Sequence, residues 1–433
     1  MVAGGLFATM MGGGMMVEKS EKTKTVAVVG AGVIGAAIAL ELQRRGLQVT
    51  LIDKGEPGRG TSYGNMASIA LDFAAGSGPS TWRKIPRWLL DPEGPVWLRP
   101  AYALKMAPWF LRFIAAGRPS RLRQIEDAGM SLSNPALTDF RAMLATIDAS
   151  DLMTDEGCLA IYETEAEFAG DQGRMDFMRR YGFGFEVLSG GDIRSLEPSL
   201  SPSIAKAVLL PDNKTIRDPY QLVVRLADAA RGLGATFVSG AVRNIEKSGD
   251  GTSVVLLESG ERLTVDSVVL AAGVHTRFLA EKLGEPIPLE TERGYHTQIM
   301  QPGVSMRYSV IWPHRAFMIT PTAGGIRVGG NVELAGLDAA PDFRRARVLV
   351  RHAQRAVPGL KVEASSEWMG HRPALPDTIP IISPSSKMPG VWYATGHGHL
   401  GLTYCATTAQ LVSDMVTGRK PAVDLAPFRI DRY

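Results

Sequence analysis

A glycine-rich turn between an apolar run and a helical pattern constrains the fold of this chain more than any other feature. Residues 25–29 (TVAVV) are typical of a short buried strand, and residues 30–35 (GAGVIG) follow at once. A helical pattern over 36–45 and a second strand over 49–53 complete the segment. This strand–helix–strand order predicts a βαβ unit and an α/β fold.

The glycine spacing in this unit is that of a dinucleotide-binding turn. Gly30 makes the tight turn, Gly32 lets the backbone approach a pyrophosphate, and Gly35 lets the helix pack on the strand. The helix start offers unpaired N–H groups and a positive dipole end to phosphates. Asp53 ends the second strand, where a carboxylate accepts from ribose hydroxyls and disfavours NADP. The turn alone does not distinguish FAD from NAD.

Three later segments favour FAD over NAD. A Gly-rich loop over 58–66 follows the second strand, where the phosphates and ring edge of a flavin would lie. The apolar strand 265–271 ends in small residues, which allow the backbone to approach a ligand. Near the end of the chain, a strand over 391–396 leads through a Gly-rich turn into a helix over 402–416, whose N-terminus suits the region near a flavin ring. The residues expected at the cofactor are Gly30, Gly32, Val33, Ile34, Gly35, Asp53, Lys54, Gly60, Thr61, Ser62, Asn65, Met66, Val242, Ala272, Gly273, Gly396, Gly398, His399, Gly401, Leu402 and Thr403.

These cofactor segments lie at both ends and in the middle of the chain, so a second domain is predicted to be threaded between them. The length of 433 residues agrees with two or three domains. We expect a disordered tail over 1–24, with Met15 or Met16 as alternative starts. The predicted FAD-binding domain comprises 25–83, 195–285 and 366–433, and the predicted substrate domain comprises 84–194 and 286–365.

Composition limits the classes of partner and the compartment. The net charge of +3 gives no reason to expect a nucleic-acid partner. The two cysteines, Cys158 and Cys405, argue against a disulfide framework and fit a reducing compartment. No stretch reaches the roughly 20 apolar residues that a membrane-spanning helix needs. We therefore expect a cytoplasmic protein.

Residues 82–123 allow two interpretations. They carry four tryptophans and nine Lys or Arg residues, against only Asp91 and Glu93. A cationic, Trp-rich surface element would suit peripheral contact with the inner face of the cytoplasmic membrane, where electrons could pass to a quinone. The alternative, which we favour, is a helical part of the substrate domain whose aromatic side chains pack inside.

Several motifs together resemble one family of flavoenzymes. They are GTSYGNMASIA at 60–70, RGYHTQI at 293–299, IRVGGNVELAG at 326–336, GHRPALPDTIPIIS at 370–383 and ATGHGHLGLT at 394–403. Over about residues 25–420 the chain resembles the D-amino-acid oxidase/glycine oxidase superfamily, and within it the bacterial D-amino acid dehydrogenases, including D-hydroxyproline dehydrogenases. The resemblance implies a Rossmann-like FAD-binding domain, of the type seen in p-hydroxybenzoate hydroxylase, with a substrate domain on a large mixed, mostly antiparallel sheet.

The resemblance also implies site residues. Arg372 matches the arginine that holds the substrate carboxylate, a role that suits a planar, bidentate guanidinium. Tyr295 matches a tyrosine near the substrate and would be a second carboxylate partner, or else a core tyrosine with a satisfied hydroxyl. His296 would then face the other side of its strand. His397 is also placed at the substrate.

Two expectations concern the cofactor and metals. In relatives with covalent flavin, the tethering cysteine falls where this chain has Gly370, so we expect non-covalent FAD. His397 and His399 form an HxH pair, but no third ligand of suitable spacing joins them, and we expect no metal.

The resemblance implies FAD-dependent oxidative deamination of a D-amino acid, with D-proline and cis-4-hydroxy-D-proline among the candidates. A hydride would pass from the α-carbon to flavin N5, and the electrons would go on to a quinone-type acceptor or the respiratory chain. The alternatives are an amine oxidase of the glycine/sarcosine type that uses O2, a flavin-stabilised subunit without turnover and an NAD-linked dehydrogenase.

Overall fold

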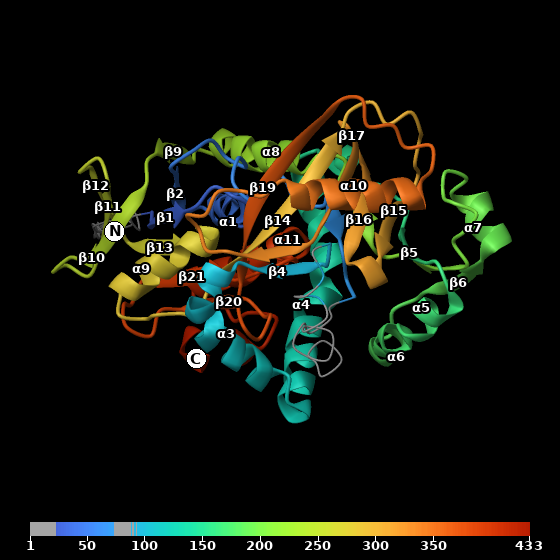
Figure 1. The fold of residues 1–433 in the computed structure, drawn as a ribbon. Helices are drawn as coiled ribbons and strands as arrows, with labels where there is room; N and C mark the ends of the chain where they lie inside the picture. The colour runs from blue at the N-terminus through green and yellow to red at the C-terminus, as the bar shows by residue number, and fades with distance from the viewer. Residues whose placement is uncertain (1–22, 73–87, 89–90, 92) are drawn as a thin grey trace, which may run out of the picture.

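Two large sheets organise the chain, as Figure 1 shows for the computed structural model, which describes residues 23–72, 88, 91 and 93–433. Most of the tail predicted over 1–24 lies outside these residues, as do Trp82 and the domain boundary predicted between 83 and 84. Within the described part, no helix combines the length and apolar character needed to cross a membrane.

A six-stranded sheet contains the predicted βαβ unit. Its order is β20 (Ile381–Pro384), β21 (Val391–Thr395), β13 (Ser267–Leu270), β1 (Thr25–Val29), β2 (Gln48–Asp53) and β9 (Thr236–Ser239). Neighbouring strands run parallel, except that β20 is antiparallel to β21. The apolar runs of β1 and β13 are buried on both faces, which is typical of parallel strands covered by helices.

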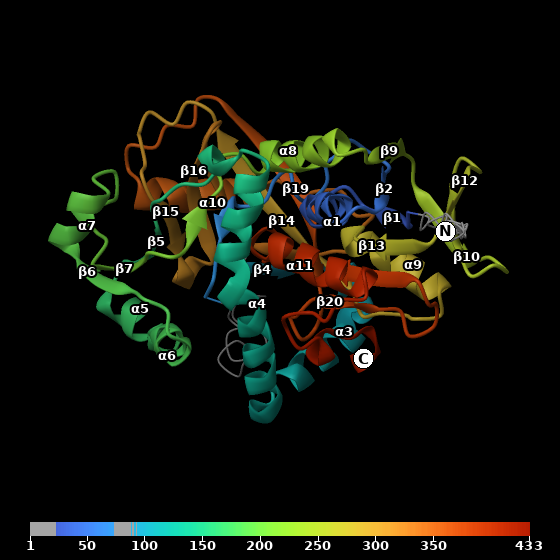
Figure 2. The same ribbon diagram turned by 180° about the vertical axis from the view of Figure 1, so that it is seen from behind.

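Helices cover one face of this sheet, and a smaller sheet lies near the other. The covering helices, seen together in Figure 2, are α1 (Val33–Arg44), α4 (Pro119–Thr146), α8 (Pro219–Gly232) and α11 (Gly401–Val416). On the other side lie α9 (Thr276–Lys282) and an antiparallel sheet of β10 (Val242–Lys247), β11 (Ser253–Leu257) and β12 (Arg262–Val265). The parallel sheet is thus buried between two apolar cores.

A ten-stranded sheet forms the second part of the molecule. Its order is β4 (Val96–Leu98), β18 (Val332–Leu334), β14 (Glu290–Ile299), β17 (Gly325–Gly330), β16 (Phe317–Thr322), β15 (Ser309–Trp312), β5 (Cys158–Tyr162), β7 (Lys206–Leu210) and β6 (Glu186–Ser189), and β19 (Ser365–Ala374) also pairs with β14. Most pairs are antiparallel, whereas β4 runs parallel to β18 and β5 to β15. The sheet is therefore mixed and mostly antiparallel, as predicted.

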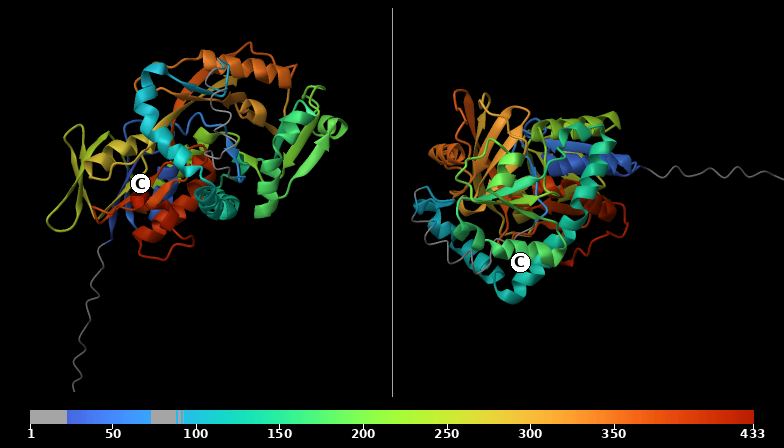
Figure 3. Two further views of the ribbon diagram at one scale, coloured as in Figure 1. Left: turned by 60° about the horizontal axis from the view of Figure 1, so that its bottom comes forward. Right: turned by 90° about the vertical axis from the view of Figure 1, so that its right-hand side faces the viewer.

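The remaining elements lie around this sheet. Helix α10 (Arg344–Ala356) packs on β14 and β17, and α3 (Ala103–Ala116) packs beside β4 and β18. Short helices α5 (Glu165–Ala169), α6 (Gln172–Tyr181) and α7 (Gly190–Leu196) project at one end, opposite the β10–β12 sheet, as Figure 3 shows. Strands β3 (Ser68–Ile69) and β8 (Lys214–Thr215) form a two-stranded antiparallel pair.

Three elements pack in a different part of the molecule from the domain to which the sequence assigns them. Strands β7 and β19 were assigned to the FAD-binding domain, but both pair within the ten-stranded sheet. Helix α4 was assigned to the substrate domain, but its apolar side packs on α11 in the core of the six-stranded sheet. Since an amphipathic helix shows only that it has an apolar face, its pattern did not indicate which core it joins.

Candidate active site

The predicted dinucleotide turn has the close contacts for which its glycines are required. Gly30 adopts a φ of +107°, and a Cβ at this position would lie 2.4 Å from the carbonyl oxygen of Ala271. A Cβ at Gly35 would lie 1.8 Å from the carbonyl oxygen of Gly30. Larger residues at either position would therefore separate α1 from β1 and β13.

Asp53 and Ser62 lie beside this turn. One carboxylate oxygen of Asp53 accepts from the Ala31 N–H at 2.7 Å, and the other accepts from the Gly55 N–H at 3.0 Å. The Ser62 hydroxyl accepts from the Val33 N–H at 2.9 Å, at the start of α1. The Ser62 oxygen thus binds an N–H group at the helix N-terminus that has no partner within the helix. A phosphate binds such N–H groups in the same way.

Three glycines from separate segments have open space where a side chain would begin. A Cβ at Gly60, Gly273 or Gly398 would meet no atom within 4 Å, and Gly273 and Gly398 have φ of +55° and +53°. They follow β2, β13 and β21, whose carboxyl ends share one edge of the parallel sheet. This edge is where open α/β sheets bind ligands, and the backbone cradle fits a dinucleotide such as FAD.

The loop 60–66 joins this edge to the ten-stranded sheet. The carbonyl oxygen of Asn65 accepts from Arg327 of β17 at 2.6 Å, and that of Met66 accepts from Thr320 of β16 at 3.1 Å. The carbonyl oxygen of Gly64 is 2.9 Å from Nδ1 of His296 on β14. The expected cofactor residues of this loop therefore lie between the two sheets.

The side chains of several other predicted cofactor residues contact other parts of the protein. The side chain of Leu402 is buried in the core, and the Thr403 hydroxyl accepts from the Ala70 N–H at 3.1 Å. A Cβ at Gly396 would lie 2.2 Å from Leu375 Cδ1, so this glycine faces protein. Val242 begins β10 and packs against the core on the far face of the six-stranded sheet. Any cofactor contact of these residues would therefore come from their backbone.

Arg372 lies on β19, on the same face of the ten-stranded sheet as Trp368 and His296, which contact Gly64 of loop 60–66. Its guanidinium donates to the carbonyl oxygens of Gly330 at 2.9 Å and Asn331 at 3.1 Å. It lies over Gly294 of β14, where a Cβ would be 2.2 Å from its Cζ atom. Two backbone carbonyls and one glycine thus determine where this cation sits.

The residues on both sides of Arg372 are bound to the predicted cofactor segments. The carbonyl oxygen of His371 accepts from the Thr61 hydroxyl at 2.8 Å, and that of Pro373 accepts from the Gly398 N–H at 2.9 Å. The loop after β2 and the turn after β21 therefore meet at Arg372.

Tyr295 does not lie with Arg372, which corrects the expectation of a shared carboxylate site. It pairs with Met369 in the β14–β19 ladder, whereas Arg372 pairs with Glu292, so the two side chains point to opposite faces. The Tyr295 hydroxyl donates to the Glu333 carboxylate and accepts from the Asp342 N–H, on the face that α10 covers. Burial and the Glu333 hydrogen bond raise the pKa of Tyr295 to about 12. It is a core tyrosine with a satisfied hydroxyl.

His397 and His399 also differ from the prediction. His397 is buried, with Nε2 at 3.0 Å from the Thr408 hydroxyl of α11, and burial lowers its pKa to about 3. It faces the helix rather than the substrate position. His399 instead reaches the ten-stranded sheet, where its Nε2 is 2.8 Å from the carboxylate of Glu292.

Glu292 lies beside Arg372 and His399, although the sequence interpretation did not include it among the site residues. Burial raises its pKa, but the hydrogen bond from His399 and the positive charges of His399 and Arg372 outweigh burial and lower it. The spacing of Glu292, Gly294 and His296 along one strand was the signal that could have placed it on the face of Arg372.

Aromatic groups complete this face. The ring of His296 stacks on Trp368 with centroids 5.1 Å apart, and burial with the charge of Arg327 lowers the His296 pKa to about 3. A Cβ at Gly64 would lie 2.2 Å from the Trp368 ring, so this ring packs directly on loop 60–66. His296 indeed faces the side opposite to Tyr295, as expected for a strand.

The environments of the two cysteines disfavour the thiolate form. Cys158 lies in β5 and Cys405 in α11, and both are buried. Burial raises the pKa of Cys158 to about 11 and that of Cys405 to about 12. Because a thiolate is the reactive form, neither is suited to a flavin tether.

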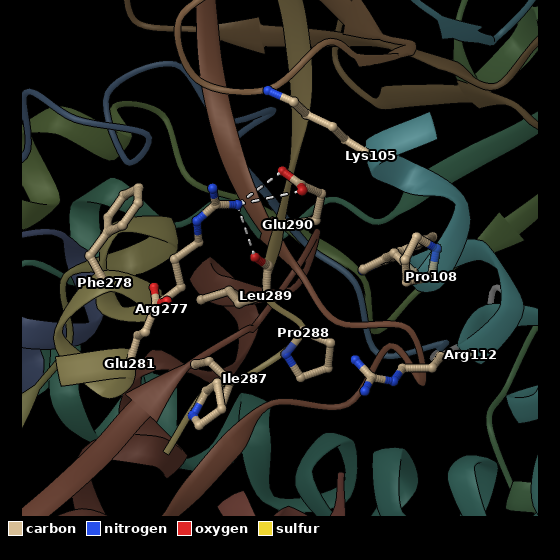
Figure 4. A pocket seen from close by; sticks show the side chains of 12 residues that line it. Lys105, Pro108, Arg112, Arg277, Phe278, Glu281, Ile287, Pro288, Leu289 and Glu290 are labelled. Carbon is tan, nitrogen blue, oxygen red and sulfur yellow. Dashed lines mark hydrogen bonds and ion pairs between the residues drawn. The ribbon is translucent and has the colours of Figure 1, made fainter. Parts of the chain in front are cut away.

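A separate pocket of about 310 Å³ lies between α3, α9 and the start of β14 (Figure 4). In Figure 4 the Arg277 guanidinium faces the Glu290 carboxylate, at 3.4 Å, and Lys105 and Arg112 extend from α3. None of the residues predicted to bind cofactor or substrate lines it. It is thus a feature apart from the site around Arg372.

Comparisons with known proteins agree with this arrangement. Residues 25–415 match the model of the FAD-dependent oxidoreductase family that is named DAO. The chain belongs to this family, and it is a FAD-dependent enzyme.

Two curated relatives illustrate the similarity. The chain is 33% identical to a D-amino-acid oxidase from Bradyrhizobium diazoefficiens, over 94% of this chain and 98% of the relative. It is 30% identical to a D-amino acid dehydrogenase from Rhodopseudomonas palustris, over 94% of this chain and 97% of the relative.

Among solved structures, glycine oxidase from Geobacillus kaustophilus has a TM-score of 0.73 at 22% identity, over 95% of this chain and all of that one. L-proline dehydrogenase from P. horikoshii has a TM-score of 0.71 at 17% identity, over 94% and 97%. These likenesses establish the shared fold.

Proposed function

We propose that this protein oxidises a D-amino acid to the imine, which water then hydrolyses to a 2-oxo acid and ammonia. The observation that carries the proposal is the position of Arg372, whose two flanking carbonyls are bound by the loop after β2 and the turn after β21. A carboxylate bound there would hold its α-carbon beside the cofactor segments. The two curated relatives named above support a D-amino acid as substrate.

The chain's own residues bind and orient the substrate. FAD, when bound, supplies the acceptor of the two electrons. Arg372 keeps further N–H groups of its guanidinium for a carboxylate, because the carbonyls of Gly330 and Asn331 occupy only one hydrogen of each terminal nitrogen. The stacked rings of Trp368 and His296 form an uncharged wall on the same face. Binding and orientation are the contributions that hydride transfer requires of the protein.

Anaerobic reduction of the flavin tests this proposal. The purified protein is mixed with D-alanine, D-proline and cis-4-hydroxy-D-proline, and with the L-enantiomers as controls. We expect at least one D-amino acid to bleach the visible flavin spectrum, and D-proline would give a cyclic imine. If no amine reduces the flavin, the assignment fails and a subunit without turnover becomes the better description.

We propose a quinone-type compound as the electron acceptor. The relative named a dehydrogenase supports this choice, whereas the relative named an oxidase and the glycine oxidase fold favour O2 as the alternative. Turnover with a soluble quinone and with O2 is compared at equal substrate concentration. Peroxide formation as fast as quinone reduction would overturn the proposal in favour of an oxidase.

We also propose that α3 contacts the inner face of the cytoplasmic membrane. Trp109 of this helix is packed inside, as expected, but Leu104 and Leu111 are 89% and 69% exposed, and Ile114 is 46% exposed. Residues 94–125 contain six Lys or Arg residues and no acid, so the apolar stripe has a cationic border. Such a helix matches an anionic lipid surface.

Vesicle co-sedimentation tests the membrane contact. We expect binding to vesicles that contain phosphatidylglycerol and little binding to pure phosphatidylcholine. The Leu104→Ser/Leu111→Ser variant is expected to remain in the supernatant, whereas Val187→Ser, at another exposed apolar position, is expected to sediment like the parent. Equal sedimentation of all three proteins would contradict the proposal.

A further inference from the structure

The position of Glu292 beside Arg372 has a chemical meaning of its own. The two residues are direct partners in the antiparallel β14–β19 ladder, so their side chains leave the sheet side by side on one face. Directly opposed side chains have Cβ atoms roughly 5 Å apart. A carboxylate and a guanidinium are therefore neighbours on the face of the sheet that meets loop 60–66.

These opposite charges are bound to other partners rather than to each other. Arg372 donates to the carbonyl oxygens of Gly330 and Asn331. Glu292 accepts from His399, at 2.8 Å, on the turn after β21. The protein thus holds one cation and one anion at adjacent positions, each by groups outside the pair.

An α-amino acid carries the complementary pair of charges. Its carboxylate and its ammonium group are attached to the same carbon, so both can meet adjacent partners of opposite sign. A ligand with a carboxylate alone would place a second negative charge beside Glu292 and would offer this residue no donor. Repulsion between the like charges disfavours such a ligand, so the site discriminates between the two ligands.

We propose that Glu292 binds the amino group of the substrate while Arg372 binds its carboxylate, and that His399 is the positioning residue that orients Glu292. This inference rests on the proposed function, since it concerns the same site. It adds an amine-recognition subsite and restricts the substrate to amino acids rather than to 2-hydroxy or simple carboxylic acids.

Two ligands of equal shape test the subsite by binding alone. 2-Aminoisobutyrate has both charges but no α-hydrogen, so it is not oxidised. Pivalate has the same carbon frame with a methyl group in place of the ammonium. Dissociation constants for both are measured by calorimetry on the FAD-loaded protein.

We expect the parent protein to prefer 2-aminoisobutyrate, and Glu292→Gln to lose about tenfold or more of that preference with little change for pivalate, as on loss of a charge-assisted hydrogen bond. His399→Ala is expected to lose part of the preference, and His399→Gln, which retains a donor, to lose less. Arg372→Ala is expected to weaken both ligands.

A matched control lies on the same strand. Glu290 points to the same face two residues earlier, but Tyr102 donates to it at 2.9 Å and Arg277 lies at 3.4 Å. We expect Glu290→Gln to keep the full preference. FAD content and thermal unfolding of each variant show that it is folded, and Glu292→Asp, which keeps the charge, is expected to recover part of the preference.

The outcomes separate the two proposals. If neither ligand binds the parent protein although a D-amino acid reduces its flavin, the subsite is overturned and the proposed function stands. If neither ligand binds and no amino acid reduces the flavin, both proposals are overturned. If both ligands bind and Glu292→Gln leaves their ratio unchanged, only the subsite is overturned. A ratio lost in Glu290→Gln as much as in Glu292→Gln would likewise overturn it, because the effect would then be a general one of charge on β14.

Discussion

A single methyl group at Gly294 should displace Arg372, the residue proposed to bind the substrate carboxylate, without disturbing the fold. A Cβ there would lie 2.2 Å from Arg372 Cζ, whereas ordinary van der Waals contact begins at 3.4 Å, so the guanidinium must move by roughly 1 Å. The atoms in its way belong to the end of a flexible side chain, so the strand itself can stay in place.

The expected effect on catalysis is large compared with the effect on stability. A misplacement of about 1 Å at a substrate-binding group can cost roughly 100-fold in kcat/KM, or about 2.7 kcal/mol. The free energy of unfolding should change by no more than about 1 kcal/mol, the range of strand propensities. We therefore expect Gly294→Ala to remain folded, to retain FAD and to lose most of its turnover of D-amino acids.

The assay pairs steady-state kinetics with urea unfolding. Gly232→Ala in α8 is the control, because a Cβ there meets nothing within 4 Å. It should leave kcat/KM unchanged and gain up to about 1 kcal/mol of stability. The reasoning about Arg372 is refuted if Gly294→Ala keeps the kcat/KM of the parent protein.

Three further predictions concern groups away from the substrate. Tyr295→Phe should lower the free energy of unfolding by roughly 1–3 kcal/mol, because Glu333 loses a buried donor. Substrate carboxylate binding should stay unchanged. A large loss of carboxylate affinity would show that Tyr295 does belong to the carboxylate site. His397, with a folded pKa of about 3 against an ordinary value of 6.5, binds protons more readily when unfolded, so stability should fall as pH drops from 6.5 towards 3, at up to about 1.4 kcal/mol per pH unit. His397→Asn should reduce the slope of unfolding free energy against pH, and an unchanged slope would contradict this account. Acid precipitation should leave all FAD in the supernatant, because Cys158 and Cys405 are buried thiols; flavin in the pellet after washing in denaturant would reveal a covalent bond.

The parts of the fold that depend on local sequence could be predicted. The turn at 30–35, its flanking strand and helix, and Asp53 at the end of β2 all follow from residues within one βαβ unit. The motif around Arg372 predicted a position next to the segments expected at the cofactor, and Arg372 lies between those segments. Local chemistry was enough because a glycine turn requires particular residues at particular positions.

The sequence did not show in the same way which side chains of β14 lie on the face of Arg372. Tyr295 and Glu292 are three residues apart on β14, and which of them meets Arg372 depends on the register with β19, more than 60 residues later. The choice between His397 and His399 depends on a turn with two glycines at positive φ, whose direction the sequence does not show. Long-range register and turn direction account for both errors.

The tight packing around Gly370 limits how this chain could evolve. A Cβ at Gly370 would lie 2.0 Å from the Trp368 ring, and that ring is itself held by stacking on His296. The family resemblance implies that a flavin-tethering cysteine would stand at this position. In this chain Gly370→Cys would meet the indole first, so a smaller residue at 368 would have to arise beforehand. The order of substitutions is thus constrained: Trp368 has to be replaced before Gly370 can be replaced by cysteine.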